Sequence, residues 1–245
     1  MKRFIKTFLI VMLAQAGLNA QTGAVPVDTI FNNFYRATGG KALWDAVQTY
    51  TIKQAYRAGT ANDYDLVIQG ALPQQALSKI RTIMKRDFIY GIKGADGWVK
   101  IPIGSRDKVT QFQTSDLSEK ERENMRRELG DLLAPFSNYT QKGYIATVVG
   151  TEQINGKPAY QVEMEGKGVK YNLYFDVATS LLVREKLTLP TREVQTRDHT
   201  QYAKSTYGIS YPSESTYVSS IDKKPVKVTT IMEFNPTISD NTFAR

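Results

Sequence analysis

Apolar and polar residues alternate with a period of two through residues 170–190, which predicts a β-hairpin with two unlike faces. The first arm places three large apolar residues on one face: Tyr171, Leu173 and Phe175. After a polar turn, the odd-numbered positions of the second arm continue that face: Leu181, Val183, Leu187 and Leu189. Glu185 is the one charged residue in this apolar series, so its orientation tests the assignment of the faces.

Short segments of the same kind, separated by turn signals, fill most of the chain and predict one antiparallel sheet in a single domain. Asp96-Gly97 and Asn155-Gly156 are the strongest turn signals, because both dipeptides tolerate the positive φ of tight hairpins. The signals add up to roughly ten or eleven strands, with a short one at 109–113. The polar residues 191–200 are interpreted as a loop or a frayed edge, followed by a strand at 201–211.

Two segments have the spacing of amphipathic helices instead. Residues 27–38 form the first helix, which ends at a pair of glycines and leads through a short helical turn into the sheet. Residues 119–133 form the second, preceded by Ser118 and Glu121 at the spacing of a capping box. Its apolar stripe consists of Met125, Leu129, Leu132 and Leu133. An apolar stripe between two groups of strands predicts a helix that closes over the sheet.

The N-terminus has the three parts of a secretory signal peptide: a basic region, an apolar run over 8–13 and small residues at 18–20. We therefore expect a signal peptide at 1–20 and a mature domain at 21–245, exported to the periplasm or beyond. No later run is long enough to predict a membrane span. The chain has no cysteine. Disulfides, thiolate catalysis and a lipid anchor on a cysteine at the cleavage site are therefore excluded.

The formal net charge is +8, and it falls to +5 without the three basic residues of the signal peptide. Because an exported protein rarely meets nucleic acid, we expect no nucleic-acid partner. Anionic lipid or envelope surfaces are the more plausible partners of a basic protein. The plainer interpretation is a solvated basic surface with no role of its own.

Signals for catalysis are sparse. His199 is the only histidine, lies in a polar segment and is interpreted as a surface residue. Glu163 and Glu165 alternate with apolar neighbours, so they look like the solvent-facing side of a strand rather than a glycosidase pair. No metal-ligand or phosphate-loop motif occurs. The sequence therefore predicts a protein that is not an enzyme and has no cofactor.

A strongly curved sheet can enclose more space than its side chains fill and can hold an apolar ligand there. The mid-chain helix is suited to close such a cavity. The residues expected to line the cavity or its lid are Phe88, Tyr90, Trp98, Phe112, Met125, Leu129, Leu132, Leu133, Leu173 and Phe175.

A series of turn and core motifs gives the chain a resemblance to a known family. In order, they are ATGGKALW at 37–44, DGWVKIP at 96–102, GTEQINGKPAY at 150–160, FDVATSLL at 175–182, YGISYP at 207–212 and FNPTI at 234–238. Their order resembles that of the periplasmic lipoprotein-carrier superfamily, in particular the LolA-like outer membrane lipoprotein-sorting proteins of Bacteroidetes-type bacteria. Such motifs carry information about the fold more than about the activity.

The resemblance implies an incomplete β-barrel of about eleven antiparallel strands, with helices over its concave apolar face. It also implies a periplasmic carrier of lipoprotein acyl chains or other lipids. Carriers of this kind latch the helical lid with an arginine on an early strand, and neither Arg57 nor Arg81 can be matched to that residue. The alternative is an envelope interaction or sensor module on the same scaffold, with a protein partner and no lipid cargo.

Overall fold

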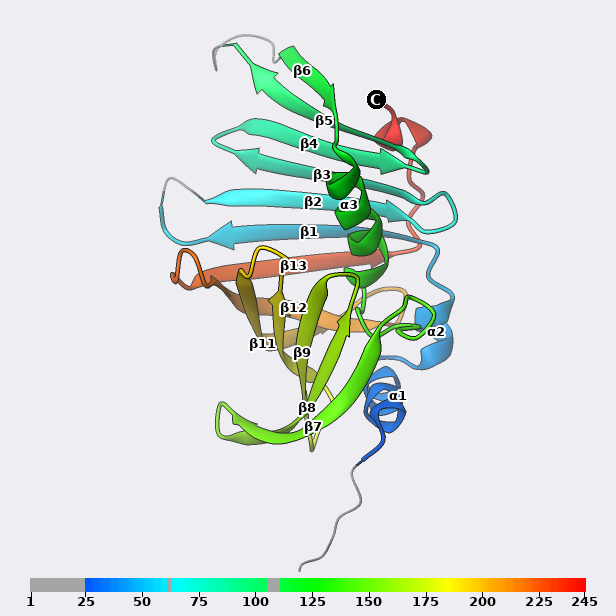
Figure 1. Ribbon diagram of the computed structural model, residues 1–245, viewed down its shortest axis with the longest axis vertical. Coiled ribbons are helices and arrows are strands. Elements are labelled where there is room, and N and C mark those ends of the chain that lie inside the picture. The colour runs from blue at the N-terminus through cyan, green and yellow to red at the C-terminus, as the bar shows by residue number, and fades with distance from the viewer. Residues whose placement is uncertain (1–24, 61–62, 105–110) are drawn as a thin grey trace, which may run out of the picture.

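The computed structural model describes residues 25–60, 63–104 and 111–245. The expected signal peptide at 1–20 and the first residues of the strand expected at 109–113 lie outside these ranges. Within them, the chain forms one open antiparallel sheet of thirteen strands with three α-helices (Figure 1). None of these helices is long and apolar enough to cross a membrane.

The first six strands form one meander: β1 (Thr49–Arg57), β2 (Tyr64–Ala71), β3 (Ala76–Ile83), β4 (Arg86–Lys93), β5 (Asp96–Ile103) and β6 (Gln111–Asp116). The other seven form a second meander: β7 (Ile145–Ile154), β8 (Lys157–Gly166), β9 (Val169–Asp176), β10 (Leu182–Thr188), β11 (Val194–Lys204), β12 (Ser210–Ser219) and β13 (Val226–Phe234). The helices are α1 (Val27–Ala37), α2 (Lys41–Asp45) and α3 (Glu119–Asp131), with a 3₁₀ turn at Asp240–Phe243.

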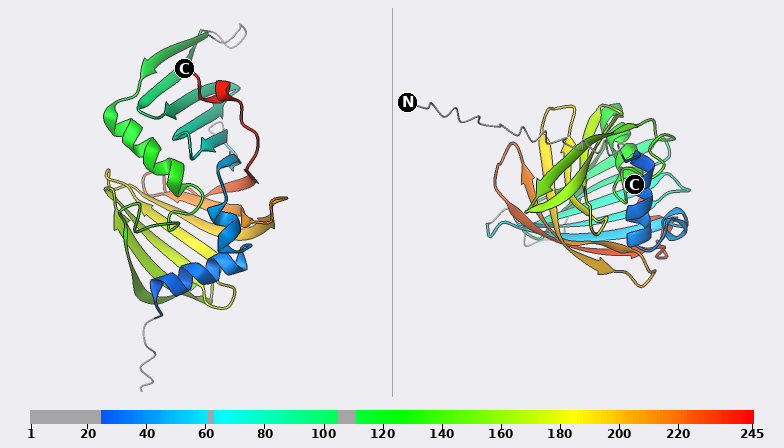
Figure 2. Two further views of the ribbon diagram at one scale, coloured as in Figure 1. Left: turned by 90° about the vertical axis from the view of Figure 1, so that its right-hand side faces the viewer. Right: turned by 90° about the horizontal axis from the view of Figure 1, so that it is seen from below.

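The sheet is joined in its middle by the pairing of β1 with β13, so that its order is β6-β5-β4-β3-β2-β1-β13-β12-β11-β10-β9-β8-β7. Its two outer strands, β6 and β7, are therefore consecutive in sequence. The chain between them includes α3, which crosses the open side of the curved sheet (Figures 1 and 2). This connection explains why a mid-chain helix covers the concave face.

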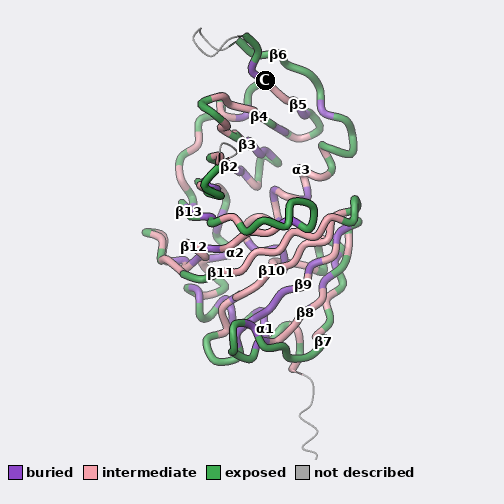
Figure 3. Tube along the Cα trace, turned by 90° about the vertical axis from the view of Figure 1, so that its left-hand side faces the viewer, coloured by how far each residue is buried: buried purple, intermediate pink, exposed green. Residues whose placement is uncertain are grey.

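The core lies on the inner face, where α1 packs against the C-terminal meander. Phe31 and Phe34 of α1 contact Phe136 and Phe175, and the Phe31 and Phe136 rings stack with centroids 4.7 Å apart. Such aromatic contacts add to the free energy gained by burying the rings. Figure 3 shows the result as a buried stretch along β9, in contrast to the exposed strand β6.

The structure confirms the expected sheet, both amphipathic helices and the capping box. The Ser118 side chain accepts a hydrogen bond from the Glu121 backbone N–H, while the Glu121 carboxylate accepts one from the Ser118 backbone. However, α3 ends at Asp131, with Leu132 as its C-cap, two residues before the expected end. The thirteen strands also exceed the ten or eleven expected from the sequence.

The polar segment 191–200 is not a loop or a frayed edge, because most of it belongs to β11. Its backbone is paired on both sides, with β10 and with β12. The strand expected at 201–211 is divided, since β11 ends at Lys204 and β12 starts at Ser210. The prediction was wrong because polar side chains on both faces of a strand remove the alternation that marks it.

The predicted hairpin is formed by β9 and β10, and all three apolar residues of its first arm are buried in the core. A bulge between Leu182 and Arg184 shifts the register of the second arm. Leu182 therefore faces the core, whereas Val183 packs on the other side of the sheet near Tyr174. The predicted apolar face is correct from Glu185 onward and wrong at Val183, because a bulge reverses the alternation of side chains.

Gly70→Ala is expected to destabilise the protein. A Cβ at position 70 would lie 2.3 Å from the ring of Tyr50, which is fully buried beneath α3. The overlap forces side chains or backbone to move, which typically costs about 1–3 kcal/mol. Gly130→Ala is the matched control, because its Cβ meets only the Lys142 side chain, at 3.5 Å, and helix propensity favours alanine by roughly 1 kcal/mol. The free energy of unfolding, measured in urea, should be lower for Gly70→Ala than for the parent and not lower for Gly130→Ala. A Gly70→Ala protein as stable as the parent contradicts the packing described.

Candidate ligand-binding cavity

The curved sheet and α3 enclose a cavity of about 1020 Å³. Strands β1–β4 and β9–β13 contribute to its wall, and α3 covers one side. Exposed residues of the β1–β2 loop, Ala58 and Thr60, and of the β12–β13 loop, Asp222 and Lys224, line one end. The cavity therefore opens to solvent between these two loops, which lie on the left in Figure 1. We call this opening the mouth.

The part of the cavity under α3 is mainly apolar. Ile52 and Ile68 are adjacent across β1 and β2, and Met232 continues the same row on β13. Met125, Leu132 and Leu133 form the opposite wall. Further apolar residues come from α1, α2, β10 and the position just after β10: Phe34, Trp44, Leu182, Leu187 and Leu189. Along each strand, every second side chain faces the cavity, and paired strands place these side chains next to one another. The apolar residues of the sheet therefore form one continuous surface.

Nearer the mouth the wall is polar and aromatic. Tyr56 and Tyr64 stack with their centroids 4.3 Å apart, and the Tyr217 ring lies edge-on to Tyr56 at 5.9 Å. The Arg81 guanidinium lies over Tyr64, 4.1 Å from its centroid. Arg197 lies 5.5 Å from the Tyr217 centroid and donates a hydrogen bond of 2.9 Å to the Tyr56 hydroxyl. We call these five residues the arginine–tyrosine cluster.

Glu185 also lines the cavity, directly across the strand pair from Arg197. Burial raises the pKa of the Glu185 carboxyl, although the positive charge of Arg197 opposes the shift. No ion pair joins the two side chains among the described residues, which leaves Glu185 without a cation at contact distance. Its place in the cavity wall agrees with the apolar face predicted for the second arm of the hairpin.

His199 is not the surface residue expected from the sequence. Its side chain lines the cavity, and neither ring nitrogen has a hydrogen-bond partner among the described residues. Burial, assisted by the charge of Arg197, lowers the pKa of the imidazole to about 3, so the ring is neutral at physiological pH. The expectation of a surface residue is wrong because His199 belongs to β11, whose alternate residues point into the cavity.

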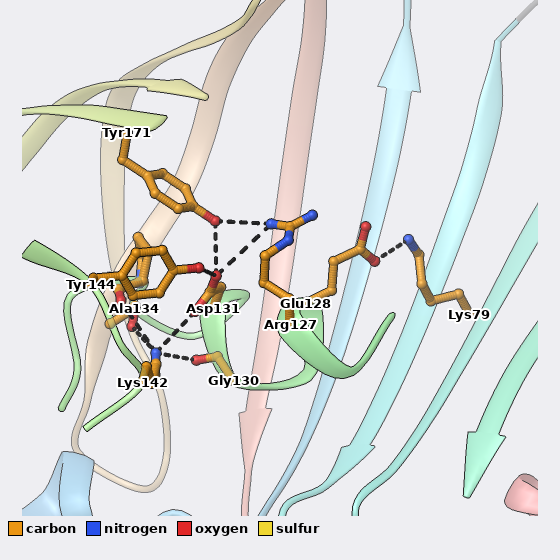
Figure 4. Close-up of polar contacts among 10 residues, drawn as sticks. Lys79, Arg127, Glu128, Gly130, Asp131, Ala134, Lys142, Tyr144 and Tyr171 are labelled. Atoms are coloured by element: carbon orange, nitrogen blue, oxygen red, sulfur yellow. Dashed lines mark hydrogen bonds and ion pairs between the residues drawn. The ribbon is translucent and has the colours of Figure 1, made fainter. Parts of the chain in front are cut away.

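Helix α3 is held in place by polar contacts at its C-terminal half (Figure 4). Asp131 is buried and accepts hydrogen bonds from the Tyr144 and Tyr171 hydroxyls, at 2.6 and 3.1 Å, and from Lys142 at 3.1 Å. Arg127 lies 3.9 Å from the same carboxylate and donates to the Tyr171 hydroxyl. Burial lowers the pKa of the Lys142 ammonium, while Asp131 opposes that shift.

Two further contacts fix the helix to the N-terminal meander. The Tyr50 hydroxyl donates to the Leu129 carbonyl oxygen at 2.9 Å, and Lys79 of β3 lies 2.5 Å from Glu128. Neither arginine on the early strands fulfils this role. Arg57 pairs with Asp65, and Arg81 lies over Tyr64. A lysine thus provides the contact between an early strand and the lid helix for which the resemblance implied an arginine.

The candidate lining residues fall into separate groups. Tyr90, Met125, Leu132 and Leu133 lie in the wall of the cavity. Leu129 of α3 and Leu173 and Phe175 of β9 are buried in the core and do not belong to the cavity wall. The other three lie outside the wall, on β4, β5 and β6: Phe88, Trp98 and Phe112.

Trp98 is buried against Gly91, where a Cβ would lie 2.4 Å from the indole. Phe112 is exposed on the edge strand β6. The sequence does not indicate the arginine–tyrosine cluster or the interior position of His199, whereas the orientation of Glu185 is the one that the apolar face of the hairpin predicts. No local signal distinguishes Gln195, Arg197 and His199 as inward-facing residues, because Thr196, Asp198 and Thr200 between them are polar as well.

The described residues contain no group of three or more His, Cys, Asp or Glu side chains that could hold a metal ion. What they offer is an enclosed space with an apolar part, a polar part and an opening. This arrangement defines a class of protein: an open half-barrel with an internal cavity that is apolar at one end and polar at the other.

The sequence matches no family model and no curated protein. The fold, by contrast, matches solved structures. One is a domain from Vibrio parahaemolyticus described as an outer membrane lipoprotein-sorting protein, with a TM-score of 0.55 and 13% identity over 88% of this chain and 95% of that one. Another is a LolA superfamily protein from Nitrosomonas europaea, with a TM-score of 0.54 and 15% identity over 91% and 99%.

A DUF1329 family protein from Desulfovibrio piger is similar to the same degree, with a TM-score of 0.53 and 12% identity over 89% of this chain and 97% of that one. The chain therefore has a LolA-like fold, as the order of its motifs implied. At these identities the likeness extends to the fold alone.

Glu185→Gln is expected to stabilise the protein at pH 8 and to leave its stability nearly unchanged at pH 4. In the unfolded chain the Glu185 carboxyl has its usual pKa of 4.5, whereas in the folded protein its pKa is raised. The folded protein therefore holds this proton more tightly, and its stability falls as the pH rises from 4.5 through the raised pKa. The contribution of His199 cancels, since both proteins contain it. Thermal unfolding of both proteins across this pH range measures the difference.

The matched control is Glu163→Gln on the outer face, where the carboxylate pairs with Lys170 at 2.7 Å. It should show no gain in stability at pH 8. If Glu185→Gln instead lowers the unfolding temperature at pH 8, attraction to Arg197 outweighs the cost of burying the Glu185 charge.

Proposed function

We propose that this protein is a carrier that binds the acyl chains of lipoproteins or other lipids in the bacterial cell envelope. The observation that carries the proposal is the cavity of about 1020 Å³, whose inner part is apolar and lies beneath a helix. Its volume is at the upper end of the ~300–1,000 Å³ typical of ligand pockets. The LolA-like fold and the signal-peptide pattern of residues 1–20 support a periplasmic place of action for residues 21–245.

The hydrophobic effect supplies the driving force. Each CH₂ group removed from water contributes about 0.8 kcal/mol, so one long chain reaches a scale of ~10 kcal/mol before the costs of ordering it. In the proposed complex Met125, Leu132 and Leu133 contact the chain from the lid, and Tyr90 contacts it from β4. Leu129, Leu173 and Phe175 hold these surfaces in position from the core behind them.

The alternative, an interaction or sensor module without lipid cargo, uses the same scaffold and predicts that acyl chains do not bind. Neither ring nitrogen of His199 has a hydrogen-bond partner among the described residues, so the histidine activates no nucleophile there and we propose no catalytic step. A carrier and an interaction module therefore differ in one measurable property, the affinity for an acyl chain.

Leu66→Trp is expected to weaken acyl-chain binding at least tenfold. Leu66 lines the cavity on β2, and an indole there would occupy space that the chain needs. Val67→Trp is the matched control, because Val67 is the next residue of the strand and faces the other side of the sheet. Delipidated protein is titrated with dodecanol, a neutral chain that reports on the cavity alone, and lipids copurifying from an envelope extract are identified by mass spectrometry.

The carrier proposal requires that the wild type and Val67→Trp bind dodecanol alike and that Leu66→Trp binds it weakly. A wild-type protein that binds no dodecanol and copurifies with no lipid rejects the proposal in favour of the interaction module. Equal binding by all three proteins places the chain outside this cavity and also contradicts the proposal.

A further inference from the structure

Two arginine side chains, Arg81 and Arg197, face the cavity and have no carboxylate partner in the ranges that the structure describes. Arg197 makes one hydrogen bond, to the Tyr56 hydroxyl, and this hydroxyl in turn donates to Gln54 at 3.0 Å. Arg81 has the ring of Tyr64 beneath it and no hydrogen-bond acceptor among the described residues. Since a guanidinium has five N–H donors, most donors of both groups have no acceptor in the described part of the chain.

The other charged groups that face the cavity have partners or lie in solvent. Lys79 pairs with Glu128, and Arg127 lies beside Asp131. At the mouth, the carboxylate of Asp63 accepts hydrogen bonds from the backbone of its own loop, and Asp222 is exposed.

Of the charged groups that remain, Glu121 accepts hydrogen bonds from Ser118, Lys224 is exposed at the mouth, and Glu185 lies across from Arg197. Burial favours its neutral form, as shown by the raised pKa of its carboxyl. Arg81 and Arg197 thus place positive charge in the polar part of the cavity, and no carboxylate of the described residues lies at ion-pair distance from either.

The arginines also have a defined place along the cavity. The sheet register puts Ile52 and Ile68 in the row beneath α3, and Tyr56 and Tyr64 in a row closer to the β1–β2 loop. The arginine–tyrosine cluster thus lies between the apolar inner part and the mouth. A ligand with an apolar chain and a polar head would lie with its chain under α3 and its head at the cluster.

We propose that Arg197 binds the anionic head group, a carboxylate or a phosphate, of a lipid whose acyl chain occupies the apolar part, and that Arg81 adds a second positive charge nearer the mouth. The inference rests on the proposed carrier function and narrows its cargo to acidic lipids. Arginine donates two parallel N–H bonds to such oxyanions, and aromatic rings keep the guanidinium in place through cation–π contacts. An acyl chain whose carboxyl group is esterified or in an amide bond carries no oxyanion that this site could bind.

The test compares ligands that share one chain and differ in the head. Delipidated mature protein is titrated by calorimetry with dodecanoate, dodecyl phosphate, dodecanol and inorganic phosphate at pH 8. We expect the wild type to bind dodecanoate or dodecyl phosphate at least tenfold more tightly than dodecanol. The stronger of the two anions identifies the head group as carboxylate or phosphate, and inorganic phosphate alone should bind far more weakly than either.

Arg197→Gln should weaken binding of the charged ligands about ten- to a hundredfold, as expected for a partly buried hydrogen bond to a charged group, and leave dodecanol affinity unchanged. Arg81→Gln, at an exposed residue where misfolding is not expected, should weaken the charged ligands a few-fold. Arg184→Gln is the matched control. Arg184 belongs to β10, the neighbour of β11, and pairs with Asp198 outside the cavity at 2.5 Å, so its loss should change none of the affinities.

Equal wild-type affinity for dodecanoate, dodecyl phosphate and dodecanol overturns the head-group proposal while the carrier function stands. Binding of none of the chains rejects both. Inorganic phosphate that binds as tightly as dodecyl phosphate shows an ion site instead of a lipid site. If Arg197→Gln no longer binds dodecanol either, the substitution has disrupted the cavity, and the test then depends on Arg81→Gln. An Arg81→Gln protein that binds the charged ligands as tightly as the wild type would overturn the proposal.

Discussion

The buried carboxylate of Asp131 connects the parts of the molecule that make its interior. It lies at the end of α3, between the lysine of the following loop, the tyrosine that precedes β7 and the tyrosine on β9. An ionised carboxylate is tolerated away from water only when its oxygens are hydrogen-bonded and its charge is balanced. Three donors, Lys142, Tyr144 and Tyr171, supply the hydrogen bonds, and Lys142 and Arg127 supply the positive charge. The position of the lid and the closure of the C-terminal meander therefore depend on one another.

The topology makes such a connection necessary. Because β6 and β7 are at opposite edges of the sheet, the segment between them has to cross the open side. The apolar stripe of α3 then faces an interior that the side chains of the sheet do not fill. Anchoring one end of the helix to the C-terminal meander and its middle to β1 and β3 keeps that space open without exposing it fully to solvent.

The same curvature explains why the interior is not uniformly apolar. Strands near the middle of the sheet continue past α3 toward the mouth, where water reaches their inner faces. Polar and aromatic residues can occupy those positions without the full cost of burial, and stacked tyrosines keep two arginines at the boundary. Because α3 covers only part of the cavity, the covered part is apolar and the part beyond the helix carries the two arginines.

The sequence by itself determined the elements whose signals are local. The capping box before α3, the Asn-Gly and Asp-Gly turns and the alternation in β9 are such signals, and their order was sufficient to indicate a LolA-like fold. The sequence could not determine features that depend on partners distant in the chain. The bulge before Arg184, the inward side of β11, and the meeting of Arg197 with Tyr56 arise from strand pairing across the sheet. Only the tertiary structure decided them, because a polar residue on a strand has the same local pattern whether it faces bulk water or the polar end of a cavity.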